Sequence, residues 1–126
     1  MIITVDPADR EPPYQQIRIQ VLAAIAASTL LPSTRLPTIR QLAADLDLAT
    51  NTVARAYREL EADCAIETRG RKGTFVRESQ PVDAGAASAR QLKAVADAYV
   101  TDARRLGVPA GEIAFALARA LATPRT

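Results

Sequence analysis

Two short stretches of polar residues carry the most recognisable chemistry in this chain. The first, Thr50-Asn51-Thr52, opens a predicted helix with uncharged hydrogen-bonding groups. The second, residues 68–77, contains four cationic side chains and no carboxylate. Asn can make two hydrogen bonds with the edge of adenine, and Arg and Lys bind phosphate oxygens. A basic run alone is usually a solvated surface, but its place after such a helix indicates nucleic-acid binding.

The N-terminal part supplies the first element that must support these groups. Residues 2–5 form a short β-prone run, which predicts an edge strand or an arm packed on the domain. Pro12-Pro13 then opens a helix over about 13–28, because proline suits a first turn whose amides have no intrahelical partner.

A pair of helices is predicted next. Thr38, with Gln41 three residues later, is a capping box that begins a short helix over about 38–45. Residues 47–48 form a turn, and a third helix covers about 50–63, with an apolar stripe at helical spacing. The order is that of a helix-turn-helix, whose second helix enters the major groove of DNA with its N-terminal end.

A basic hairpin follows the pair. Residues 65–69 and 74–77 alternate in polarity as strands do. Gly70 and Gly73 bracket its cationic tip and can take the positive φ angles that a tight turn requires. The sequence therefore predicts a mainly α fold with a small β-wing, in which residues 1–78 form a winged helix-turn-helix DNA-binding domain.

The remaining residues, 79–126, predict a linker and a two-helix C-terminal dimerisation tail. A polar linker over 79–88 overlaps the start of a long helix over about 86–106, and a last helix over about 110–122 is apolar nearly all round. Such a helix must be covered, and a second copy of the chain is the expected cover. The predicted dimer interface consists of Leu92, Val95, Tyr99, Leu106, Ile113, Phe115, Leu117 and Leu121.

Composition argues against other classes of protein. The chain has 126 residues, no His and one Cys, so a metal site, a catalytic triad and an intrachain disulfide are not expected. Cys64 closes a helical apolar pattern and is predicted to be a small buried hydrophobe, with a redox-sensing thiol as the alternative. No cofactor and no enzymatic activity are expected. The chain has no apolar run of the ~18 residues needed to span a membrane and no secretory signal, which predicts a cytoplasmic protein.

Four segments resemble the N-terminal domain of the GntR family of bacterial transcription regulators. They are PPYQQI, RLPTIRQLA, NTVARAYREL and IETRGRKGTFV, in the family's order and spacing, from about Pro12 to Val76. The short tail resembles the YtrA-type subfamily by length and pattern. The resemblance implies a homodimer that binds a pseudo-palindromic operator, most often as a repressor and commonly beside transporter genes.

One departure from the family pattern concerns the start of the third helix. The family usually has a polar residue followed by Pro, where this chain has Ala49-Thr50. Because Ala is a poor N-cap, Thr50 is expected to cap the helix instead. This shifts the first base-reading positions by about a residue.

The candidate DNA-binding residues follow from the motif and the resemblance. They are Arg35, Arg40, Thr50, Asn51, Thr52, Arg55, Arg69, Gly70, Arg71, Lys72 and Gly73. Asn51 is expected to contact a base, with a simple helix-start role as the alternative. Arg55 is expected to contact DNA, with an ion pair to Glu59 as the alternative. Arg40 is expected to contact phosphate and so to position the protein on DNA without reading sequence, and Arg58 and Arg77 are expected to be surface residues.

Several alternatives remain open at this point. Arg35 could bind phosphate or tie its loop to Asp45 or Asp47. The same fold could serve as a nucleoid-binding protein or a protein–protein adaptor. A small apolar or cationic effector could bind between the helices of the dimer near Tyr99 and Phe115, although ordinary core or interface packing of both rings is the favoured interpretation.

Overall fold

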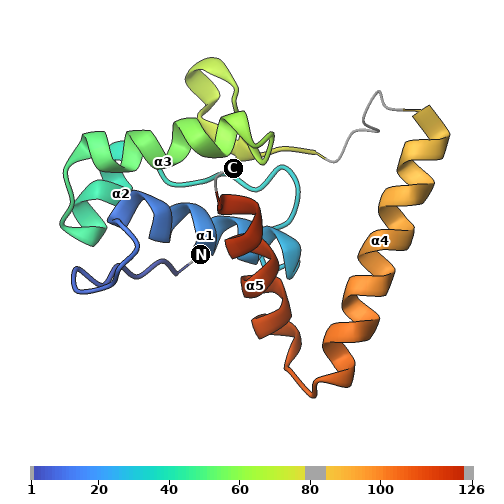
Figure 1. Ribbon diagram of the computed structural model, residues 1–126. Helices are drawn as coiled ribbons and strands as arrows, with labels where there is room; N and C mark the ends of the chain where they lie inside the picture. Colours follow the sequence, from blue (N-terminus) through green and yellow to red (C-terminus); the bar gives the residue numbers. More distant parts are fainter. Residues whose placement is uncertain (1, 79–84, 124–126) are drawn as a thin grey trace.

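The computed structural model describes residues 2–78 and 85–123. The elements within these residues, in chain order, are α1 (Pro13–Ala26), α2 (Ile39–Leu46), α3 (Thr50–Ala62), β1 (Ile66–Thr68), a 3₁₀ turn η1 (Gly70–Lys72), β2 (Thr74–Val76), α4 (Gly85–Arg105) and α5 (Ala110–Ala122). The predicted fold class, a winged helix domain followed by a helical C-terminal region, is confirmed (Figure 1).

The N-terminal residues form an arm on α1 and no strand. Ile3 is buried, and the backbone of Thr4 both donates to and accepts from the Gln20 side-chain amide, at 3.0 and 2.6 Å. The arm is therefore held by the buried Ile3 side chain and by two hydrogen bonds between the Gln20 side chain and the Thr4 backbone.

Helix α1 ends at Ala26, two residues earlier than predicted. Ser28 adopts a left-handed conformation with φ of 61°, and the amides of Thr29 and Leu30 donate to Ala24 O at 2.9 and 3.1 Å. These bonds satisfy the last helical carbonyls and close the helix before the predicted boundary.

The core lies where α1, α3 and the base of the wing meet. Its most completely buried large side chains are Ile17, Leu60, Val21, Val53 and Val76. Burial of aliphatic side chains at about 25 cal/mol per Å² is the main force that fixes the angle between α1 and α3. The position of α3 is consequently set by its inner face, which leaves its outer face free for recognition.

The wing is anchored to the body by a third backbone segment. Strands β1 and β2 pair antiparallel, with Ile66 opposite Val76. On the other edge of β2, Ser33 N donates to Val76 O and Leu36 N donates to Thr74 O, both at 2.8 Å. The hairpin is thus fixed to the body by backbone hydrogen bonds on both edges of β2.

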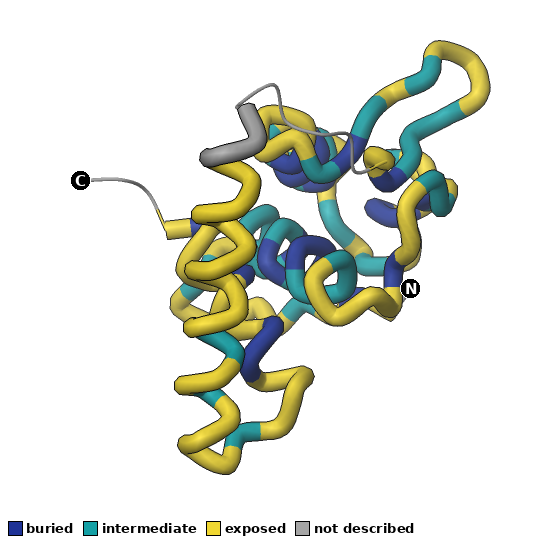
Figure 2. Tube along the Cα trace, turned by 90° about the vertical axis from the view of Figure 1, so that its right-hand side faces the viewer, coloured by how far each residue is buried: buried dark blue, intermediate teal, exposed yellow. Residues whose placement is uncertain are grey.

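The two C-terminal helices behave differently. Helix α5 lies against α1 and buries Ala118 and Ala122 in the common core, whereas α4 stands away from the body and is exposed along most of its length (Figures 1 and 2). Residues 85–88 of the predicted linker are helical, and residues 79–84 lie outside the described residues. The division at residue 78 stays a prediction, because α5 returns to the N-terminal half. No helix in 2–78 or 85–123 is long and apolar enough to cross a membrane.

The prediction that Cys64 is buried is wrong. Cys64 is exposed and has a φ of 60°, one residue beyond the cap of α3. The Ala65 amide donates to Leu60 O at 3.0 Å, which ends the helix in a left-handed turn. The apolar periodicity stops before Cys64, so the side chain turns outward.

Candidate nucleic-acid interface

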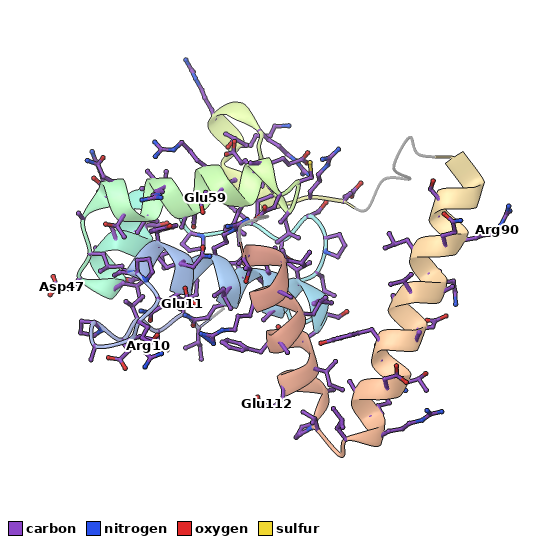
Figure 3. The ribbon with its side chains drawn as sticks, in the orientation of Figure 1. Arg10, Glu11, Asp47, Glu59, Arg90 and Glu112 are labelled. Carbon is purple, nitrogen blue, oxygen red and sulfur yellow. The ribbon has the colours of Figure 1, made fainter. Side chains whose placement is uncertain are left out.

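Helices α2 and α3 form the expected helix-turn-helix. The predicted capping box is present: Thr38 Oγ1 accepts from Gln41 N, and Gln41 Oε1 accepts from Thr38 N, both at 3.1 Å. Asp47 ends α2 in the left-handed conformation, with φ of 55°. Its side chain points away from the body at the outer end of the pair (Figure 3).

Tyr57 fixes the second helix to the start of the first. Its buried hydroxyl donates to Pro37 O at 2.6 Å. Burial raises the pKa of Tyr57 to about 12, so the hydroxyl stays protonated and remains a donor at neutral pH. This bond and the apolar contacts around it hold α3 at one angle to α2.

The start of α3 differs from the prediction in its cap. The N-cap residue is Ala49, in an extended conformation, and no side chain caps the helix. Thr50 is the first helical residue, because the amides of Thr52 and Val53 already donate to Ala49 O at 3.1 and 3.5 Å. The prediction that Thr50 caps α3 is therefore wrong, since the backbone closes its first turn one residue earlier.

That uncapped end presents polar groups to solvent. Thr50 and Asn51 are exposed and Thr52 is half-buried, whereas Val53 is fully buried. A helix start without a side-chain cap leaves amide donors and the positive end of the helix dipole available to an anion. The geometry is suited to a phosphate beside the helix end and to base edges beneath Asn51.

Arg55 lies one turn further along α3 and has two partners within the protein. Its guanidinium stacks on the Tyr14 ring, 3.8 Å from the centroid, and its Nε lies 3.8 Å from Glu59 Oε1. The predicted alternative, an ion pair at i+4, is thus present. The side chain is still 53% exposed, so a phosphate or a base could replace the weak ion pair.

The wing tip projects its cations into solvent. Gly70 and Gly73 have φ of 55° and 114°, as the turn requires, and Arg71 and Lys72 are exposed between them. Figure 2 shows the tip as the most protruding part of the N-terminal half. Arg71 and Lys72 are the wing cations with the freest reach towards phosphate.

Arg69 braces the base of the wing. Its guanidinium pairs with Glu67 at 2.7 Å and stacks 4.6 Å from the centre of the Phe75 ring. The NH2 group of Arg69 also donates a long hydrogen bond to Ser33 Oγ, at 3.4 Å. These contacts engage Arg69 with the protein, so its direct contact with DNA stays a prediction with less geometric support than that of Arg71.

Arg35 lies beside the wing. A Cβ placed on Gly73 would approach Arg35 Nε to 3.1 Å, so glycine gives the guanidinium room as well as permitting the positive φ. Among the ion pairs of the described residues, none joins Arg35 to Asp45 or Asp47. Arg40 is exposed in the first turn of α2.

The recognition groups share one side of the molecule. Figure 1 shows α3 along the top of the view, with the wing rising above its far end and α1 and α5 beneath. The outer face of α3 and the wing tip are therefore presented together. Winged helix-turn-helix domains bind duplex DNA with such a surface, in which the recognition helix enters the major groove and other groups contact the DNA backbone.

Sequence reasoning missed the residue that ties these elements together. Arg18 lies on α1, and its side chain is only 15% exposed and contacts Glu59 of α3 and Asp63 just after it. Its hydrogen bond and ion pair with Asp63 raise the pKa of Arg18, so it stays cationic. No signal in the local sequence pairs residues so far apart.

The predicted dimer-interface residues differ in how far the single chain buries them, and Tyr99 is half-buried. Leu92, Val95, Leu106 and Leu121 are between 61% and 78% exposed, whereas Ile113 is buried within the chain. Phe115 and Leu117 are about one third exposed, at 38% and 37%. The exposed members remain candidates for contact with a second copy.

The two rings considered for an effector do not share a site. Tyr99 donates its hydroxyl to Ile113 O at 3.2 Å and lines hollows of about 290 and 400 Å³ beside α4 and α5. Phe115 lines a different hollow, of about 300 Å³, with the N-terminal arm and Arg119. The two rings therefore line different hollows in the described part of one chain, and the effector site between the helices of a dimer stays a prediction.

Proteins of similar sequence and fold are known. The profile of the bacterial regulatory proteins of the gntR family matches residues 13–76, which includes the α2–α3 pair and the wing. The HTH-type transcriptional regulator Rv1152 of Mycobacterium tuberculosis is 48% identical over 106 residues, covering 84% of this chain and 83% of that protein. The HTH-type transcriptional repressor YtrA of Bacillus subtilis is 31% identical over 107 residues, covering 85% and 82%.

A solved structure agrees with these sequence relatives. YtrA from Sulfolobus acidocaldarius, a GntR-family transcription factor, superimposes with a TM-score of 0.59 and 28% identity over 80% of this chain and 99% of that one. The similarity thus includes the C-terminal helices as well as the winged domain. The chain belongs to the GntR family of bacterial regulatory proteins, as a short, YtrA-like helix-turn-helix transcriptional regulator that binds DNA.

Proposed function

We propose that the protein is a homodimeric repressor that binds a pseudo-palindromic operator in duplex DNA, in the cytoplasm. The observation that carries the proposal is the shared exposure of the start of α3 and the cationic wing tip on one side of the molecule. In this arrangement Asn51 reads base edges, while Arg71 and Lys72 bind the flanking phosphates.

The homodimer is supported by the apolar stripe of α4. Leu92 and Val95 are each 66% exposed and lie on the same helical face as Tyr99. A 21-residue helix that stands away from the body with an exposed apolar face is not stable in water by itself. A second copy supplies the missing cover, and the two-fold axis of a dimer requires two similar half-sites in the operator.

The sign of regulation and the target follow from relatives. The Bacillus subtilis relative is named as a transcriptional repressor, and we propose the same role for the present chain. We propose a transporter operon as the target, on the resemblance to the YtrA-like subfamily. A repressor of this kind acts by occupying DNA that RNA polymerase needs, which requires affinity but no catalytic group.

Selection from random duplex oligonucleotides tests the proposal. We expect the full chain to enrich one sequence with two inverted half-sites. Enrichment of no sequence, with uniform retention of all duplexes, would contradict operator binding and favour a nucleoid-type role. Recovery of a single, unrepeated half-site would contradict the dimeric arrangement.

Asn51→Ala should reduce discrimination between the selected operator and a scrambled duplex. The amide makes the only contact proposed here that distinguishes a base by two hydrogen bonds, so its loss should cost about 1–3 kcal/mol on the operator and little on random DNA. Fluorescence-anisotropy titrations of both duplexes measure the difference. Arg58→Ala, at an exposed position of the same helix, is the control. If Asn51→Ala still discriminated between operator and scrambled duplex as the wild type does, Asn51 would not be a base-contacting residue.

A further inference from the structure

Arg18 joins three elements that are far apart in the sequence. From α1, its Nε and NH2 donate to the two carboxylate oxygens of Asp63 at 2.8 and 2.7 Å. Its NH1 lies 3.3 Å from Glu59 Oε2 and 3.4 Å from Ala122 O. Every nitrogen of one nearly buried guanidinium is thus engaged, with acceptors on α3, just after α3 and at the end of α5.

The contact with α5 is a helix C-terminus held by α1. Ala122 is the last residue of α5, where carbonyls have no intrahelical donor and the helix dipole is negative. Gln15 Nε2 also donates to Ala122 O, at 2.9 Å. The packing of α5 against α1 therefore places an acceptor, Ala122 O, where it helps to orient the Arg18 guanidinium.

The contact with α3 leads to a predicted DNA-binding residue. Glu59 is shared: Oε2 faces Arg18 at 3.3 Å, and Oε1 faces Arg55 Nε at 3.8 Å (Figure 3 marks Glu59 on α3). Arg55 also stacks on Tyr14, which lies one turn before Arg18 on α1. One carboxylate thus stands between the cation that secures α5 and the cation that faces solvent beside the recognition surface.

We propose that Arg18 is a positioning residue for DNA binding, which engages one carboxylate oxygen of Glu59, keeps the Glu59–Arg55 ion pair long, and thereby couples the packing of α5 on α1 to the operator affinity. The inference rests on the proposed function, operator binding, and adds the candidate residue Arg55 to its DNA interface. With Arg18 in place, the Glu59 charge is shared between two guanidiniums, and its 3.8 Å contact with Arg55 is weak enough for a phosphate or a base to replace. Without Arg18, Glu59 has Arg55 as its remaining cation, closes on it and withdraws it from DNA.

The coupling is reciprocal in binding free energy. A DNA backbone that engages Arg55 leaves Glu59 to Arg18, which strengthens the arrangement that also holds Ala122 O. Operator binding should therefore slow amide hydrogen exchange in the last turn of α5. The effect would extend beyond the DNA surface, because the α3 residues placed at the DNA lie on its outer face. Displacement of α5 should have the opposite effect on operator affinity.

A double-mutant cycle on the full chain tests the proposal. Arg55→Met should weaken binding to the selected operator about tenfold in the wild-type background. In an Arg18→Met background the same change should cost less than about threefold, because Arg55 is already withdrawn. The control background is Arg105→Met, which removes an exposed ion pair with Asp102 within α4, 3.8 Å long. There the full tenfold loss should persist.

Glu59→Gln gives a second readout that does not depend on the stability of Arg18→Met. Removal of this charge frees Arg55 in any background, so Glu59→Gln alone should raise operator affinity about threefold and should restore the Arg55 effect in Arg18→Met. Lower affinity in Glu59→Gln would overturn the proposal. Thermal unfolding of each variant confirms that the compared chains are folded.

Amide hydrogen exchange measures the link to α5 directly. In the wild type the operator should slow exchange in residues 118–123, and in Arg18→Met it should leave them unchanged. An equal Arg55→Met loss in the wild-type and Arg18→Met backgrounds, or no operator effect on these amides, would overturn the inference while leaving operator binding intact. A wild-type chain that prefers no duplex would instead refute the proposed function.

Discussion

Val95→Asp should convert the protein into monomers and weaken operator binding by at least about a hundredfold. The α4 stripe that contains Val95 is exposed in the single chain, so a carboxylate there costs little in folding. In a dimer the same carboxylate would be buried against apolar side chains without a partner, which is strongly unfavourable. Loss of the dimer separates the two recognition surfaces, and linked half-site contacts commonly contribute a factor of 10²–10⁴ in affinity.

Light scattering and anisotropy titration measure the two effects in the same samples. Ala94→Asp is the matched control, because it introduces the same charge one residue away on the opposite, exposed side of α4. It should leave a dimer with unchanged affinity. A Val95→Asp variant that remains dimeric would place the interface elsewhere, for example on the exposed part of α5. Leu117 is a less clean position for this test, since it also lines the hollow between α1, α4 and α5.

Leu60→Ala should lower the free energy of unfolding by about 2–5 kcal/mol. Leu60 has no exposed surface and lies on the inner face of α3, in the cluster that joins α1 to the base of the wing. Its truncation removes apolar contacts and leaves a cavity that rigid helices cannot close fully. Because a domain of this size is stabilised by about 5–15 kcal/mol in total, the loss is a large fraction of the stability.

Denaturant unfolding followed by circular dichroism gives the comparison. Arg58→Ala, two residues earlier and exposed, should change the free energy of unfolding by no more than about 0.5 kcal/mol. A loss below about 1 kcal/mol for Leu60→Ala would mean that α3 is not held by this cluster. Its orientation as a reading helix would then need another cause.

Local patterns in the sequence predicted the elements closely. Helices α2 and α3 and the wing follow from apolar spacing, the Thr38–Gln41 capping box and the glycines at the hairpin tip, all of which act within a few residues. The errors also lie at short range. The cap of α3 moved to Ala49, and Cys64 turned outward, because backbone hydrogen bonds close a helix end whatever the side-chain preference.

The contacts between distant elements could not be predicted in this way. Arg18 and Ala122 are separated by 104 positions, so their contact depends on α5 returning to α1 and not on any local pattern. The same holds for the contact of Arg69 with Ser33, 36 positions away, which helps to brace the wing against the body. The sequence could identify cations but not which of them the fold would occupy internally.

The measurement that most directly tests operator recognition is a salt-dependent anisotropy titration of the selected operator and a scrambled duplex, with the wild type and Arg71→Ala. We predict that the wild type prefers the operator by at least about 10³-fold at physiological salt. The logarithm of its affinity should fall linearly with the logarithm of salt concentration, and Arg71→Ala should weaken both duplexes and reduce this slope by about one. Equal wild-type affinity for the two duplexes would contradict sequence-specific binding, and an unchanged slope in Arg71→Ala would contradict a phosphate contact by the wing.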